Sequence, residues 1–167
     1  VPEDVAKIRI RSLARAADIL ADPTKYDPRS KETADHSLPY VIAAALVERK
    51  VTPAQFEPEK IMDPRIREQL HKVEVIADPE IEKVFPALQR VGVTIDTTDG
   101  RQVGMELDYP KGDPRNPLTE DEIEGKFDAL AEGVLSKDKA RRLKDAVWRV
   151  DELDSVSELL ELCATDL

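Results

Sequence analysis

A run of apolar residues at positions 38–47 is the feature that most constrains how this chain folds. It reads Leu-Pro-Tyr-Val-Ile-Ala-Ala-Ala-Leu-Val and has no polar side. A helix that is apolar on nearly every side has to be buried all round. His36 or Ser37 is suited to cap its start, and Pro39 is tolerated in the first turn. The run is well short of the ~20 residues that span a bilayer, so we expect other parts of the protein to cover it.

The segments around this run show strand patterns and helix starts. Residues 7–11 alternate charged and aliphatic side chains, and residues 72–75 do the same, which predicts two half-buried strands. The stretch between residue 11 and the apolar run is polar and contains Asp22-Pro23 and Asp27-Pro28, so we expect a long loop there. Thr52-Pro53 and Asp63-Pro64 each place a capping side chain before a proline, which predicts two short helices.

The clearest strand pair lies at residues 91–95 and 103–107. A two-residue turn would split the apolar side chains between the two faces of the hairpin. A three-residue loop of residues 98–100 instead places the apolar residues of both strands on one face, in the pairs Ile95 with Val103, Val93 with Met105 and Val91 with Leu107. We therefore predict a type I turn with Gly100 in the left-handed position of a G1 bulge.

The pattern changes after the hairpin. Residues 109–117 contain three prolines and cannot continue a sheet. Three helices are predicted beyond them, the first with a capping box of Thr119 and Glu122, the others starting near Ser136 and Ser155. The chain is thus expected to have an α+β fold, with a small antiparallel sheet and helices in residues 1–117 and a helical segment in residues 118–167.

The composition excludes several classes of function. The net charge of −10 argues against binding to nucleic acid or to anionic membranes. The single cysteine, Cys163, cannot form an internal disulfide, which fits a reducing, cytoplasmic setting. The two histidines and one cysteine have no zinc-site spacing. P-loop and dinucleotide-binding fingerprints are also missing from the sequence. We expect no metal and no nucleotide cofactor.

The start of the apolar helix is the best candidate for chemistry. His36, Ser37 and Tyr40 place an imidazole, a hydroxyl and a phenol within one helical turn, beside backbone amides that attract anions. A purely structural interpretation remains open, in which Ser37 caps the helix, Tyr40 packs and His36 is a neighbour. In the loop at residues 109–117, Lys111 and Arg115 are candidates for binding an anion.

A series of short motifs resembles the MmgE/PrpD family. Residues 34–40 read Ala-Asp-His-Ser-Leu-Pro-Tyr and are similar to a characteristic region of that family. Further similar motifs occur in the same order along the chain: Asp27-Pro28-Arg29, the turn at 97–100, Lys111-Gly112, Asn116-Pro117-Leu118-Thr119 and Lys126-Phe127. The resemblance covers nearly the whole chain.

The resemblance implies a helical domain closed by a smaller α+β lid, with metal-independent chemistry on di- or tricarboxylates and no cofactor. Reactions in the family include dehydration of 2-methylcitrate, decarboxylation of cis-aconitate and epimerisation of iminodisuccinate. It implies that Tyr40 is catalytic. His36 is a further candidate for catalysis, and Ser37 and Lys111 are candidates for binding substrate. The family's other acid and base groups would lie upstream, outside this chain.

The resemblance also implies partners. Residues 118–167 would pack on an N-terminal helical domain of the same or another chain, and their apolar stripes would otherwise favour a homo-oligomer. The leading hypothesis is the C-terminal part of a 2-methylcitrate dehydratase-like lyase. The alternatives are a stand-alone, non-catalytic interaction protein that reuses the fold, and a decarboxylase or epimerase of the same family.

Overall fold

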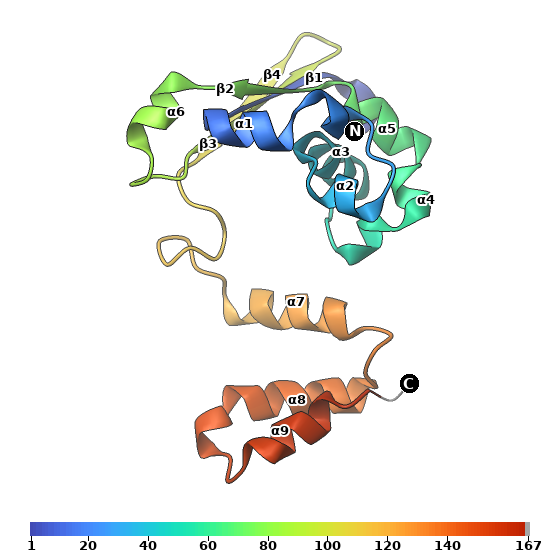
Figure 1. Cartoon of the computed structure of the whole chain (residues 1–167), viewed down its shortest axis with the longest axis vertical. Coiled ribbons are helices and arrows are strands. Elements are labelled where there is room, and N and C mark those ends of the chain that lie inside the picture. Colours follow the sequence, from blue (N-terminus) through green and yellow to red (C-terminus); the bar gives the residue numbers. More distant parts are fainter. Residues whose placement is uncertain (166–167) are drawn as a thin grey trace. The chain divides into compact units, whose positions relative to one another are not determined.

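The computed structural model describes residues 1–165 and divides the chain into two compact units, Val1–Asn116 and a second that begins at Pro117. Figure 1 shows the elements of both units. The first unit contains the strands β1 (Val5–Ser12), β2 (Val73–Ala77), β3 (Val91–Thr97) and β4 (Gln102–Leu107), the α-helices α1 (Ala14–Leu20), α2 (Lys31–Asp35), α3 (Leu38–Glu48), α4 (Pro58–Ile61), α5 (Pro64–Leu70) and α6 (Pro79–Val84), and the short 3-10 helices η1 (Pro2–Asp4), η2 (Pro23–Tyr26) and η3 (Pro53–Phe56). Across residues 1–165 no helix combines the length and the apolar character needed to cross a membrane.

The four strands form one sheet in the order β2-β1-β3-β4. The α+β class is confirmed, but the sheet is mixed and not wholly antiparallel. β1 pairs with β3 and β3 with β4 in antiparallel fashion, whereas β1 and β2 are parallel. The reason is the connection between β1 and β2, which runs through α1 to α5 and returns the chain to the same end of the sheet, as parallel pairing requires.

The prediction of a long loop after β1 is wrong. The chain there forms α1, η2 and α2, with only short connections. The side chain of Asp22 accepts a hydrogen bond from the Thr24 amide and so caps η2, and Ser30 caps α2 through the Thr33 amide. The Asp-Pro pair and the serine therefore start short helices, because each supplies an oxygen to an amide that has no partner in the first turn.

The hairpin has the predicted register. Val91 pairs with Leu107, Val93 with Met105 and Ile95 with Val103. Gly100 has a φ of 86°, and its amide donates to the Thr97 carbonyl at 3.0 Å, while the Thr97 amide donates to the Arg101 carbonyl at 2.8 Å. This geometry is the three-residue loop with a bulge at Gly100, and it keeps the apolar side chains of both strands on one face.

Helix α3 lies between two hydrophobic cores. On one side Leu38, Ile42 and Leu46 pack against a cluster on the sheet made of Val5, Ile8, Ile10 and Val73. On the other side Tyr40, Ala43 and Ala44 belong to a cluster completed by residues of α2, α4 and α5, namely Ala34, Ile61, Ile66 and Leu70. Figure 1 shows these short helices gathered around α3. No residue of α3 is exposed, so the expected burial on all sides is confirmed.

The second unit contains α7 (Glu120–Ala131), α8 (Lys137–Trp148), the 3-10 helix η4 (Val150–Glu152) and α9 (Val156–Cys163). The predicted capping box of Thr119 and Glu122 is present, and Ser136 and Ser155 cap α8 and α9. Burial is sparse, with Ala131, Leu143 and Ala146 the buried residues of its helices over the described part of the chain. Several large apolar side chains are exposed: Ile123, Leu130, Val147, Val156 and Leu160.

Two glycines provide opposite tests of this fold. Gly100→Ala forces an alanine into the left-handed region at φ 86° and should lower the free energy of unfolding by about 1–2 kcal/mol. Gly125→Ala lies inside α7 with open space around the new methyl group, so it should raise helix stability by about 1 kcal/mol. Thermal unfolding followed by circular dichroism measures both changes. A stabilising Gly100→Ala would contradict the bulged turn.

Candidate functional site

Ser37 connects the start of α3 to the segment before it. Its hydroxyl oxygen accepts a hydrogen bond from the Tyr40 amide at 3.1 Å. The same hydroxyl donates a hydrogen bond to the Lys25 carbonyl at 2.6 Å. The Ser37 side chain is fully buried. Both hydrogen-bonding functions of the hydroxyl are thus used inside the protein, one to cap α3 and one to hold η2 against the helix start.

Tyr40 points into the core shared by α3, α4 and α5. It is 0% exposed, and its ring lies 5.9 Å from that of Phe56 in a tilted arrangement. The hydroxyl donates to the backbone carbonyl of Gln55 at 2.5 Å. Burial, followed by the charges of Asp63 and Glu48, raises the pKa of Tyr40 to about 12. The phenol therefore stays protonated at neutral pH and can serve as a hydrogen-bond or proton donor, but not as a base.

The carbonyl that accepts the hydrogen bond from the Tyr40 hydroxyl belongs to the short helix η3. The Gln55 side chain accepts hydrogen bonds from the Thr52 amide at 2.9 Å and from the Thr52 hydroxyl at 2.8 Å. Gln55 is itself buried, with 2% of its surface exposed. This capping arrangement fixes the η3 backbone and, with it, the position of the Tyr40 hydroxyl.

His36 lies at the end of α2 and faces solvent. Its Nδ1 is 3.0 Å from the Glu32 carbonyl and 2.6 Å from the Asp35 carboxylate, and 67% of its side chain is exposed. The Glu32 carbonyl and then the Asp35 carboxylate raise the pKa of His36 above its usual 6.5. Among the described residues that influence the pKa of His36, Lys25 is the positively charged one, and its charge lowers that pKa.

The four predicted site residues thus fall into separate environments. Ser37 and Tyr40 are joined by a hydrogen bond in the interior, whereas His36 is on the surface. Lys111 is exposed in the loop after β4. That loop is held by Arg115, which stacks 3.9 Å above the Tyr109 ring and donates to the Ala87 carbonyl at 2.9 Å. The second predicted anion ligand, Arg115, is therefore engaged in shaping the loop.

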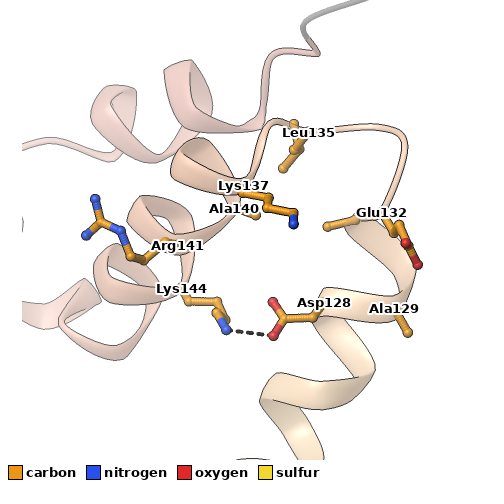
Figure 2. A pocket seen from close by; sticks show the side chains of 9 residues that line it. Asp128, Ala129, Glu132, Leu135, Lys137, Ala140, Arg141 and Lys144 are labelled. Carbon is orange, nitrogen blue, oxygen red and sulfur yellow. Dashed lines mark hydrogen bonds and ion pairs between the residues drawn. The ribbon is translucent and has the colours of Figure 1, made fainter.

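A separate cleft lies between α7 and α8 in the second unit, and Figure 2 shows the side chains that line it. Its volume is about 550 Å³, and its apolar lining comes from Ala129, Ala131, Leu135 and Ala140. Lys144 donates to Asp128 at 2.9 Å and to Glu124 at 3.2 Å. These ion pairs connect the two helices. Among residues 1–165, no group of three acidic, histidine or cysteine side chains could hold a metal ion.

Two participants were not singled out from sequence. Gln55 supplies the carbonyl that orients Tyr40, and Asp35 supplies the carboxylate beside His36. The pattern Thr52-Pro53-Ala54-Gln55 has the spacing of a capping box, which was a usable signal for η3. The contact between Gln55 and Tyr40 depends on how the chain turns after α3, and local sequence patterns do not report that.

The raised pKa of His36 gives a pH-dependent prediction. Because the folded protein favours the protonated imidazole, the stabilisation from His36 is fully present below its unfolded pKa and is lost as pH rises through the folded value. In NMR titration we expect the His36 pKa above 6.5 in the native chain and lower in Asp35→Asn, which keeps the Glu32 carbonyl but removes the carboxylate charge. An Asp35→Asn chain with an unaltered His36 pKa would contradict this electrostatic account.

Comparison with known proteins places this arrangement in a family. Cis-aconitate decarboxylases of Mus musculus and Homo sapiens are 30% and 33% identical to the chain over 135 and 136 residues, which is 81% of this chain and 28% of each relative. Alkylcitrate dehydratase phiI of a fungal species is 29% identical over 157 residues, covering 87% of this chain and 30% of that protein. The chain therefore spans less than a third of the length of these relatives. Residues 1–152 match the MmgE/PrpD C-terminal domain, and the chain belongs to the MmgE/PrpD family.

Proposed function

We propose that this chain is the C-terminal part of a metal-independent lyase that acts on di- or tricarboxylates. The observation that carries this proposal is the match of residues 1–152 to the C-terminal domain of the family, together with the 28% to 30% of each relative that the chain spans. On this proposal residues 1–117 are the lid. Residues 118–167 return to an N-terminal helical domain, on the same or another chain, that supplies the remaining acid and base groups.

The relatives support a carboxylate substrate. Two are named for decarboxylation of cis-aconitate and one for dehydration of an alkylcitrate. In both reactions a group leaves next to a carboxylate, and carbanion-like charge that develops there is stabilised by cationic and hydrogen-bonding groups. We propose dehydration of 2-methylcitrate as the reaction, with decarboxylation of cis-aconitate and epimerisation of iminodisuccinate as the alternatives within the family.

We propose a different task for each site residue, based on its surroundings. With a pKa of about 12, Tyr40 acts as a neutral donor. Its hydroxyl reaches a substrate only when η3 moves away, because it is fully covered and bound to Gln55. His36, which is exposed and whose pKa is raised, is the accessible acid, and Lys111 contributes a cation for a substrate carboxylate. Ser37 acts by fixing the start of α3 and not by contacting substrate.

The second candidate function is a non-catalytic interaction protein that reuses the fold. The observation that favours it is the complete burial of Ser37 and Tyr40, whose hydroxyl groups are both engaged within the chain. On this reading the two residues are retained for packing and capping. The two proposals differ in what happens when the Tyr40 hydroxyl is removed.

Tyr40→Phe separates stability from chemistry. Removing the hydroxyl leaves the buried Gln55 carbonyl without its donor, which should lower the free energy of unfolding by about 1–3 kcal/mol. In the protein completed with its N-terminal region, the lyase proposal expects turnover to fall about 10²-fold or more at a temperature where the variant stays folded. Chemical denaturation and steady-state kinetics measure the two effects.

Tyr109→Phe is the matched control, because it removes the hydroxyl of a tyrosine that is only partly buried and keeps the ring beneath Arg115. Its stability and turnover should both stay close to those of the parent protein. If Tyr40→Phe loses stability but keeps its turnover, Tyr40 is a core residue and drops out of the mechanism.

Substrate choice is tested on the same completed protein. Incubation with 2-methylcitrate, cis-aconitate and iminodisuccinate, followed by NMR of the products, should show turnover of one of these acids and leave malonate unchanged. Loss of water, release of carbon dioxide and inversion at the amino-bearing carbon identify the three reactions. A folded, completed protein that converts none of them would support the interaction protein over the lyase.

A further inference from the structure

Strand β4 is an uncovered edge of the sheet. It pairs with β3 on one side, and it has no strand on its other side within the described chain. Every residue of β4 is exposed. The exposed fractions include 55% for Val103, 66% for Met105 and 46% for Leu107. Three large apolar side chains therefore stand in a row on the outermost strand, which we call the β4 apolar row.

The β4 apolar row lies on the same face of the sheet as the core. Val103 is in register with Ile95 and Ile8, and Met105 with Val93 and Ile10. Helix α3 covers Ile8 and Ile10, and Val91, Val93 and Ile95 pack partly against the same cluster. The cluster ends at β3. The β4 apolar row continues the hydrophobic face beyond the area that the helices of this unit cover.

Strand β4 lacks the sequence features that usually keep an exposed edge strand from pairing with another strand. Natural edges carry charged side chains, prolines or bulges, and within β4 the charged side chain is Glu106 alone. Its carboxylate binds Arg11 at 2.6 Å and lies 3.3 Å from Arg90. Arg11 crosses the sheet at Gly92, where a methyl group would come within 2.8 Å of the guanidinium. The one charge is thus neutralised on the face opposite the apolar row.

The backbone of β4 is ready to pair. The Thr97 amide donates to the Arg101 carbonyl, which makes residue 101 point its polar groups toward β3. Because these groups alternate along an antiparallel strand, residues 103, 105 and 107 also face β3. Residues 102, 104 and 106 then direct their amides and carbonyls away from the sheet, where a further strand would accept and donate hydrogen bonds.

We propose that β4 pairs with β4 of a second copy of this chain, antiparallel and about a two-fold axis at Met105. The register is decided by the side chains. It sets Val103 opposite Leu107 of the other copy and Met105 opposite Met105, while Gly104 faces Glu106 on the other face. Every apolar residue of the row gains an apolar partner, and no two like charges are opposed. The two sheets join edge to edge.

The neighbouring symmetric registers fit less well. An axis at Gly104 sets Leu107 opposite Arg101, and an axis at Glu106 sets two carboxylates opposite each other. A shift by a single residue in one strand would exchange the faces and oppose apolar with polar side chains. The arrangement about Met105 is therefore the self-complementary one, which is the property that selects a second copy as the occupant.

Cysteine crosslinking tests this register. In a Cys163→Ser background, Met105→Cys brings two cysteines directly opposite each other at the axis, within the distance that a disulfide needs. Mild oxidation of the full chain should convert most of it to a covalent dimer on non-reducing gels. Val103→Cys in the same background is the matched control, since its two copies are separated along the strands and should form little dimer.

Light scattering of the uncrosslinked chain provides the second measurement. The parent chain should show a dimer that dissociates on dilution, and Met105→Lys, which opposes two ammonium groups at the axis, should shift it to monomer with at least a tenfold rise in the dissociation constant. Ile19→Lys, a like change at an exposed apolar residue of α1, should leave the dimer intact. A parent chain that is monomeric at all concentrations, or crosslinking of Val103→Cys in preference to Met105→Cys, overturns the proposal.

Discussion

The sharing of α3 between two hydrophobic cores is the constraint on which the first unit depends. Leu38, Ile42 and Leu46 face the sheet, and the opposite side of the helix faces the short helices α2, α4 and α5. Neither core is complete without this helix. The long connection between β1 and β2 contains α3 and returns the chain to the same end of the sheet, so that β1 and β2 pair in parallel. The same connection thus produces the mixed sheet and places α3 where both of its sides are covered.

The same packing decides what the candidate site is able to do. The first turn of α3 holds Ser37 and Tyr40 by hydrogen bonds to Lys25 and Gln55, each donated to a backbone carbonyl. Such hydrogen bonds give the helix start a definite position, but they also occupy the single donor of each hydroxyl group. His36 lies one residue outside this core and keeps an accessible imidazole, whose pKa is raised by the Glu32 carbonyl and the Asp35 carboxylate. Structural and chemical tasks are thus divided between adjacent residues.

Local patterns predicted those features whose cause is local. The hairpin register followed from placing apolar residues on one face, and the caps at Ser37, Thr119, Ser136 and Ser155 followed from an oxygen beside unpartnered amides. The parallel pairing of β1 with β2 and the contact of Tyr40 with Gln55 were not predictable in this way. Both features depend on which parts of the chain meet after many intervening residues. Hydrophobic periodicity and helix-capping patterns are local and carry no such information.

The candidate site also combines a prediction from a local pattern with one that has another source. The apolar pattern around Tyr40 predicted a buried helix, while the resemblance to a family predicted a chemical role, and the two expectations meet at one side chain. A phenol that is 0% exposed satisfies the first and leaves the second as a proposal. Adding a further domain can only cover more of this surface, so access to Tyr40 has to come from within the unit. The capped helix η3, which holds the Tyr40 hydroxyl through Gln55, is the element whose movement would provide that access.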